Sequence, residues 1–190
     1  MTRTLKLALA SAVLLVAPIS TAIAQMPAAT PAAKAPDPTP FREVMAAYKQ
    51  TKTIIIASAQ LMPAENFSFK ATPDIRTYAE MFTHVAQTQE SICPLIAGTP
   101  PAARPAQSTV ATKDDVLAVI KHSFDTCDAA YASVTEANMN EISGSGFFRG
   151  TKLGNMWKNV AHNNEMYGQM VIYMRLKGLV PPSTAMRGRM

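Results

Sequence analysis

Apolar residues recur at helical spacing in four stretches of the chain, which cover roughly residues 39–61, 72–98, 112–131 and 151–178. Within each stretch, apolar side chains stand three or four positions apart and polar residues fill the positions between them. No segment alternates apolar and polar residues for long enough to predict a strand. The pattern therefore predicts an all-α domain, and four amphipathic helices of this length typically pack as a four-helix bundle.

Capping residues predict where these helices begin and end. Thr39–Pro40 and Thr72–Pro73 each place a capping threonine before a proline in the first turn, which predicts the starts of the first two helices. Thr112 and Asp115 have the spacing of a capping box, with aspartate in place of glutamate, and predict the start of the third helix. Gly178 follows the fourth stretch at the position where glycine commonly ends a helix.

The connection between the second and third helices is long enough to decide the topology. It runs from Ala97 to Thr112, sixteen residues rich in proline and alanine, and when extended it spans roughly 50 Å at ~3.3 Å per residue. The second helix is only about 35 Å long at 1.5 Å per residue. The connection can therefore cross the whole bundle, so we expect a long crossover that makes the second and third helices parallel.

Residues 1–24 have the organisation of a secretory signal peptide. The basic residues Arg3 and Lys6 precede a short apolar run, and the small-x-small sequence Ala22-Ile23-Ala24 predicts cleavage before Gln25. No cysteine follows the cut, so a lipid anchor is not expected. No later apolar run approaches the ~20 residues needed to cross a bilayer. We therefore expect a periplasmic or secreted protein that has no membrane anchor after cleavage.

The rest of the chain divides into a linker and one domain. Residues 25–38 are almost entirely alanine, proline and threonine, a composition typical of a disordered linker. Residues 39–190 are enough for one domain with its own core. Removing Arg3 and Lys6 from the 18 basic residues leaves 16 against 13 acidic residues, so the formal charge of the mature chain is only +3. Because no basic stripe is visible, nucleic-acid binding is not expected.

Cys93 and Cys127 are the two cysteines of the chain. Parallel second and third helices place them at similar heights, whereas antiparallel helices joined by a tight loop separate them by more than the ~7 Å between Cα atoms that a disulfide tolerates. An oxidising compartment also favours a bridge. The sequence predicts a Cys93–Cys127 disulfide, and the alternative is a pair of buried free thiols.

Two histidines are the candidate site residues. At 100° per residue, His84 on the second helix and His162 on the fourth lie well away from the centre of each apolar stripe. Neither is placed like a packed core residue. Each therefore faces either solvent or a groove between the second and fourth helices. His122, among polar neighbours on the third helix, is interpreted as a solvated residue.

The sequence around these histidines resembles the DinB/YfiT-like metalloenzyme superfamily of four-helix bundles. The resemblance covers most of the mature chain and includes the motifs Met81-Phe-Thr-His84, His162-Asn-Asn-Glu-Met-Tyr-Gly-Gln169 and Leu179-Val-Pro-Pro-Ser183. It implies that His84 and His162 belong to a three-histidine site with open coordination positions, which suits nickel or zinc and activates a water or a thiol. In that family a histidine stands where this chain has Met166, so the resemblance implies a degenerate site.

The change at position 166 leaves several ligand sets open. A thioether binds divalent ions of this kind poorly, and two histidines alone give weak, exchangeable binding. Glu165 could complete a set of two histidines and one carboxylate, although it lies some 60° around the helix from His162. Met166 and Met170 continue the row from His162 and suggest Cu(I), against the alternative that they only fill the core.

These observations lead to two functional hypotheses. The first is an exported DinB-like protein with a degenerate divalent-metal site, related to metal-dependent hydrolases or thiol transferases. In that hypothesis His84 and His162 hold the metal, and Glu165 is the nearest general base. The second is a non-catalytic bundle that binds a small apolar molecule, Cu(I) or a partner helix in the same groove. The resemblance also implies a homodimer, although no dimer face is visible in the sequence.

Overall fold

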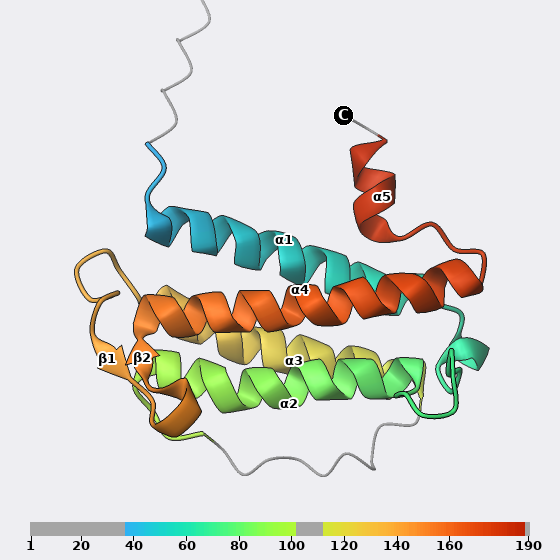
Figure 1. Cartoon of the computed structure of the whole chain (residues 1–190), viewed down its shortest axis with the longest axis horizontal. Helices are drawn as coiled ribbons and strands as arrows, with labels where there is room; N and C mark the ends of the chain where they lie inside the picture. The colour runs from blue at the N-terminus through green and yellow to red at the C-terminus, as the bar shows by residue number, and fades with distance from the viewer. Residues whose placement is uncertain (1–36, 102–111, 189–190) are drawn as a thin grey trace, which may run out of the picture. The chain divides into compact units, whose positions relative to one another are not determined.

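The computed structural model describes residues 37–101 and 112–188. The predicted signal peptide, most of the predicted linker and the middle of the long connection lie outside these residues. The described chain is built from four long helices, a short fifth helix and a small hairpin (Figure 1). The long helices are α1 (Pro40–Leu61), α2 (Tyr78–Ala97), α3 (Lys113–Ala132) and α4 (Lys152–Leu176). The all-α, four-helix prediction is therefore confirmed.

α2 and α3 run parallel, as the long connection predicted. The Ser123 hydroxyl donates to Gln89 Oε1 at 2.7 Å, and Cys93 is bonded to Cys127. Both pairs join residues 34 positions apart. A constant offset at two successive turns occurs only between helices that run in the same direction. The disulfide therefore closes the α2–α3 layer, with both cysteines fully buried and their Cα atoms 5.0 Å apart.

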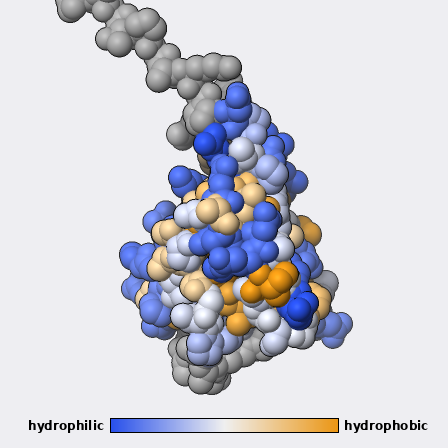
Figure 2. Space-filling view, turned by 90° about the vertical axis from the view of Figure 1, so that its left-hand side faces the viewer, coloured by the Kyte–Doolittle hydropathy of each residue, from blue (hydrophilic) through white to orange (hydrophobic). Residues whose placement is uncertain are grey.

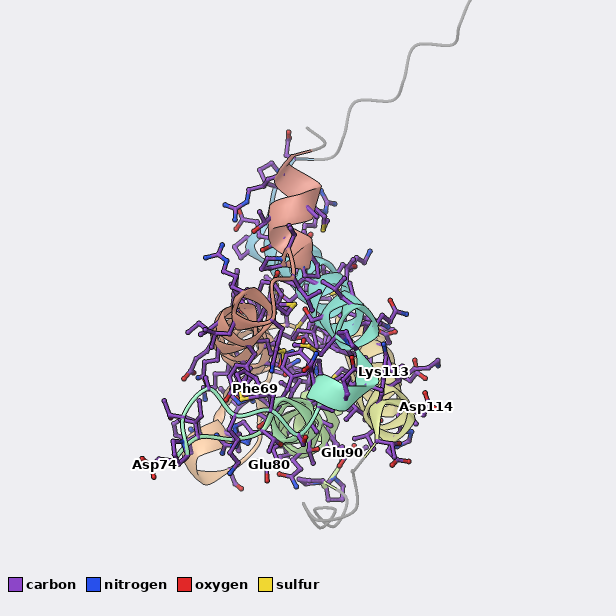
Figure 3. All side chains as sticks on the ribbon, turned by 90° about the vertical axis from the view of Figure 1, so that its right-hand side faces the viewer. Phe69, Asp74, Glu80, Glu90, Lys113 and Asp114 are labelled. Carbon is purple, nitrogen blue, oxygen red and sulfur yellow. A yellow bond between two sulfur atoms is a disulfide. The ribbon has the colours of Figure 1, made fainter. Side chains whose placement is uncertain are left out.

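α1 runs antiparallel to α3, and α2 runs antiparallel to α4. Lys113, at the start of α3, donates to the carbonyls of Gln60 and Met62 at the end of α1. Tyr173, near the end of α4, donates to the carbonyl of Arg76 just before α2. A view along the bundle shows α1 beside α3 and α4, with α2 completing the square between them (Figure 3). The topology is up, down, down, up, and it brings α2 and α4 together along one side.

The structure corrects the predicted start of the second helix. It begins at Tyr78 and not at Thr72–Pro73. The Thr77 hydroxyl accepts from the Glu80 amide, while the Glu80 carboxylate accepts from the Thr77 amide. This reciprocal capping box satisfies two helix-end donors at once. Thr77 therefore supplies a stronger start than the earlier Thr-Pro pair, and Ile75, which lies between the predicted and the observed start, is 40% exposed.

The sequence pattern did not predict two small elements, a hairpin after α3 and a short helix after α4. A hairpin pairs β1 (Ile142–Ser143) with β2 (Gly150–Thr151), and the short 3-10 helix η3 (Gly146–Phe148) lies between the strands. Two-residue strands are too short to show alternation. The proline pair at 181–182 follows α4, and Pro182 begins a further helix, α5 (Pro182–Arg187). No helix in the described ranges combines the length and apolar character that a membrane crossing requires.

Candidate metal site

His84 and His162 face each other across the interface between α2 and α4. Their Nε2 atoms lie 3.1 Å apart, and their ring centroids are 5.0 Å apart with an interplanar angle of 61°. Both side chains are half-buried. The sequence left open whether each histidine faces solvent or a shared groove. The structure brings the two rings together in the groove.

The antiparallel packing of α2 and α4 places these side chains. His84 lies in the second turn of α2, and His162 lies in the third turn of α4. Thr88 follows His84 by one helical turn and therefore lies on the same face of α2. Its hydroxyl lies 3.4 Å from His162 Nε2. His162 Nε2 consequently has two polar neighbours from the opposite helix.

The two rings form part of the wall of a cleft of about 440 Å³. Lys158 also lines the cleft, where its ammonium donates to the carbonyl of Phe147 at 2.9 Å and lies 5.3 Å from the centroid of that ring. The complete lining is His84, Thr88, Ile92, Phe147, Phe148, Lys158, Ala161, His162 and Glu165. The cleft thus combines two imidazoles and one carboxylate with aromatic and aliphatic walls.

The hairpin beside the cleft exposes apolar surface. The space-filling view of this end of the bundle shows an apolar patch among polar residues (Figure 2). The large apolar side chains exposed in the hairpin are Ile142, at 59%, and Phe147, at 83%. Phe147 is therefore largely exposed to solvent, and it also lines the cleft.

Burial lowers the pKa of His162 below its usual value, because desolvation penalises the imidazolium. The Asn163 side chain and the Glu165 carboxylate act in the opposite direction. The net direction favours neutral imidazole near neutral pH. This is the form that binds a metal ion through a ring nitrogen.

The structure corrects the position expected for Met166. The sequence placed it beside His162, at the edge of the groove. In the structure Met166 is 3% exposed and belongs to the hydrophobic core, as does Met170 at 0%. Neither methionine lines the cleft. The thioethers therefore act as core residues, which favours the core-filling interpretation over a Cu(I) site.

Glu165 is the only carboxylate among the residues that line the cleft. It is exposed, unlike the half-buried histidines. Within the described ranges, no group of three or more His, Cys, Asp or Glu residues is arranged to hold a metal ion. The structure therefore brings two imidazoles together, with Glu165 nearby in the cleft.

The spacing of the two Nε2 atoms tests whether they fit one ion. Two nitrogens bonded to the same tetrahedral ion at about 2.0–2.1 Å lie roughly 3.3–3.4 Å apart. The observed 3.1 Å is close to this value. It equally suits a hydrogen bond in which one ring donates and the other accepts. The pair is therefore held near ligating geometry by contacts within the protein.

Sequence reasoning missed several residues of this region. Thr88 and Lys158 line the cleft but carry no recognisable motif. Asn155, Asn159 and Asn163 lie fully buried along α4. Their four-residue spacing on one helix was the signal that could have identified them. The remaining histidine, His122, is exposed on α3, in agreement with its interpretation as a solvated residue.

A larger groove of about 600 Å³ lies between α1 and α3, on the other side of the bundle. Its wall contains the stacked rings of Tyr48 and Tyr131, with centroids 4.0 Å apart. The Tyr48 hydroxyl donates to Asp128 at 2.8 Å, and Asp128 is also paired with Lys52. These polar groups satisfy one another, so the groove presents no converging ligand set like that of the histidine cleft.

Comparison with known proteins identifies the fold. No protein-family model matches the chain, and no curated protein matches it. Among solved structures, a DinB-like protein from Bacillus cereus ATCC 10987 superposes with a TM-score of 0.63 at 15% identity, covering 74% of this chain and 95% of that one. The mycothiol-dependent maleylpyruvate isomerase superposes with a TM-score of 0.57 at 16% identity, covering 70% of this chain and 60% of that one.

A point mutant of the same isomerase gives a TM-score of 0.56 at 17% identity, with the same coverage. The fold that the resemblance implied is thus confirmed: the chain has a DinB-like four-helix fold.

Proposed function

We propose that this protein is an exported DinB-like bundle that binds one divalent metal ion, nickel or zinc, through His84 and His162. The observation that carries the proposal is the 3.1 Å separation of the two Nε2 atoms in a cleft that reaches solvent. Two imidazoles suit both ions. A bound ion would act as a Lewis acid and lower the pKa of a coordinated water or thiol.

Binding at this site is weaker than in a three-histidine site. Met166 lies in the core, so it supplies no third ligand. Glu165 lines the cleft and adds favourable electrostatic interaction with a cation, while the remaining coordination positions stay open to solvent or a small molecule. Mycothiol-dependent chemistry in a protein of the same fold supports a thiol as one class of molecule for those positions.

A second candidate function is the binding of a small apolar molecule in the same cleft without metal. Phe147, Phe148 and Ile92 favour it, because they give the cleft apolar walls. Metal titration separates the two candidates, since an apolar ligand site gains nothing from a divalent ion. A site for apolar molecules is instead detected by an environment-sensitive apolar dye that does not compete with zinc.

The test is a titration of the cleaved protein with Zn²⁺ and Ni²⁺, followed by thermal unfolding. At a free metal concentration of one hundred times Kd, binding stabilises the fold by about 2.7 kcal/mol. We expect His84→Ala and His162→Ala to abolish this gain. His122→Ala is the matched control, because His122 is exposed on a different helix, and it should respond as the wild type does. A full metal response in His84→Ala would overturn the proposal.

Export is tested separately. We propose that residues 1–24 are removed during secretion and that the mature chain begins at Gln25, in the periplasm or outside the cell. Expression of the full chain in a bacterium, followed by fractionation and intact-mass measurement, should recover a protein that lacks the first 24 residues from the periplasm or medium. Recovery of the full-length mass in the cytoplasm would contradict export.

A further inference from the structure

A row of asparagines runs along the buried face of α4. Asn155, Asn159 and Asn163 are each fully buried and stand four residues apart. Asn155 Nδ2 donates to the Ser143 hydroxyl at 3.0 Å. Asn159 Nδ2 lies 3.7 Å and 3.8 Å from the two disulfide sulfurs and 3.2 Å from the Tyr131 hydroxyl. In contrast, neither polar atom of the Asn163 side chain has a hydrogen-bond partner in the described part of the chain.

The partner residue across the core follows from the helix register. Cys93 on α2 lies opposite Asn159 on α4. Because the two helices are antiparallel, one turn back along α2 corresponds to one turn forward along α4. Gln89 therefore lies opposite Asn163. Gln89 is fully buried and accepts from Ser123 through Oε1, but its Nε2 has no partner among the described residues.

These atoms define a polar layer one turn from the disulfide. Gln89 Nε2 is a donor, and Asn163 offers one donor and one acceptor. Leaving a buried polar group without a partner costs ~1–3 kcal/mol. Water is small, neutral and able both to donate and to accept, and buried waters typically make about three hydrogen bonds to such groups. No charged side chain belongs to the layer, so a neutral molecule fits it better than an ion.

The layer lies next to the metal site along α4. His162 precedes Asn163, and its Nδ1 is buried without a hydrogen-bond partner in the described structure. A histidine that presents an Nε2 lone pair to a metal carries its proton on Nδ1, and that proton requires an acceptor. Thr88 is already placed to donate to Nε2 at 3.4 Å. The Asn163 side chain acts on His162 as a hydrogen-bond acceptor that favours the charged ring, although Nδ1 and both Asn163 polar atoms have no partner in direct hydrogen-bond geometry.

We propose that Gln89 and Asn163 form a buried water site behind His162, and that this hydrated amide pair accepts the Nδ1 proton of His162. The lone pair of Nε2 is thereby directed into the cleft toward His84. Gln89 and Asn163 are positioning residues, because they act through the water and His162. The water site stands by itself, whereas its effect on metal affinity rests on the proposed function.

The first test uses metal-free protein and nuclear magnetic resonance. Long-range ¹H–¹⁵N correlation spectra identify which ring nitrogen carries the proton, and a His162→Gln variant assigns the signals. We expect His162 to be protonated on Nδ1. Cross-relaxation between water and the side-chain amide protons of Gln89 and Asn163 should show a long-lived bound water. An Nε2-protonated ring, or amide protons without contact to water, would overturn the proposal.

Variants separate positioning from mere packing. Asn163→Leu keeps the volume but removes the polar atoms, so it should move the His162 proton to Nε2. Asn163→Asp keeps an acceptor and should preserve the Nδ1 proton. Asn155→Leu, in the same buried row but two turns away, should leave the tautomer unchanged. An unchanged tautomer in Asn163→Leu would contradict the inference. If that variant does not fold, the wild type and Asn163→Asp decide the question.

Metal affinity provides an independent measurement. Loss of a group that orients a metal-binding histidine typically weakens binding roughly 10- to 100-fold, and we expect Zn²⁺ affinity to fall by this amount in Asn163→Leu. A Zn²⁺ affinity equal to that of the wild type would contradict the positioning role. Failure of wild-type protein to bind metal would reject the proposed function alone, because the tautomer and the bound water are measured without metal.

Discussion

α2 contributes to two residue pairs that differ in almost every physical respect. Cys93, near its end, joins Cys127 on the parallel helix α3, and both residues are fully buried. His84, near its beginning, meets His162 on the antiparallel helix α4, and both rings are half-buried beside a cleft. The first pair is covalently closed. The second is open to solvent, and its ring nitrogens are the ligands of the proposed metal site.

This difference separates stability from function within one bundle. The disulfide constrains the unfolded chain and requires no access to solvent. The histidine pair contributes little to folding, because a partly exposed hydrogen bond replaces one made to water. The histidine pair can bind a ligand only if that ligand reaches both Nε2 atoms, so the pair requires access from solvent. The same helix therefore anchors the fold at one end and presents the proposed metal-binding pair at the other.

The largest expected effect comes from removing the disulfide. The bridge closes a loop with a sequence separation of 34, which corresponds to roughly 3–4 kcal/mol in the chain-entropy model. Cys93→Ala combined with Cys127→Ala should lower the free energy of unfolding by this amount in denaturant titrations. His84→Ala combined with His162→Ala should cost about 1 kcal/mol or less without metal. Equal losses of unfolding free energy in the two double variants would contradict the proposed difference between the disulfide and the histidine pair.

A substitution at position 166 tests the histidine pair further. Met166→His restores a second imidazole one turn after His162, a spacing at which two histidines on one helix can share an ion. We expect Zn²⁺ and Ni²⁺ affinity to rise about tenfold or more, together with a lower thermal stability of the metal-free protein, because a polar ring replaces a buried thioether. Calorimetric titration measures the two metal affinities, and thermal unfolding measures the stability of the metal-free protein.

Met170→His is the matched control for that substitution. Met170 is also buried on α4, one turn further along. It should cost stability in the same way but should not tighten metal binding, because it lies two turns from His162. No gain in affinity for Met166→His would reject an inherited three-ligand geometry.

Glu165 is expected to have a smaller effect. The carboxylate lines the cleft but is exposed, so it acts on a bound cation mainly through space and through solvent. Glu165→Gln should weaken divalent binding about two- to fivefold, in line with exposed charge pairs. Glu43→Gln, at an exposed position in the first turn of α1, should have no effect on affinity. A loss of a hundredfold would instead identify Glu165 as a direct ligand.

The smallest effect concerns pH. Burial lowers the pKa of His162 in the folded state, whereas the unfolded residue titrates near about 6.5. The unfolded chain therefore binds more protons in this range, so stability falls as the pH drops from about 6.5 toward the folded pKa. His162→Gln should flatten this part of the curve when thermal unfolding is followed without metal. A steeper curve in the variant would show that the sign is wrong.

Much of the fold could be predicted from sequence because it depends on local and pairwise signals. Helical periodicity gave the four long helices, and the length of the crossover gave the parallel pair. The register of that pair brings Cys93 to Cys127. The start of α2 was predicted wrongly because Thr72–Pro73 has the pattern of a helix start, whereas the residue that caps the helix is Thr77, which has the reciprocal partner Glu80.

The site was predicted only in part. Off-stripe positions and the family motifs identified His84 and His162, but a helical wheel does not tell a groove from open solvent. The wheel also misplaced Met166, because a helix packed between several neighbours buries more than one stripe. Gln89 could not be recognised, since a buried amide is distinguished from an exposed one only by the packing of other helices. The only sequence signal for Asn163 was the four-residue spacing of the asparagines on α4.

The most direct test of the central claim is a crystal structure of the cleaved protein grown with Zn²⁺, using anomalous scattering at the zinc edge. We predict a single zinc peak in the cleft between α2 and α4, bonded to the Nε2 atoms of both His84 and His162. Zinc bound only elsewhere on the molecule, with the two rings still joined by a direct hydrogen bond, would contradict it.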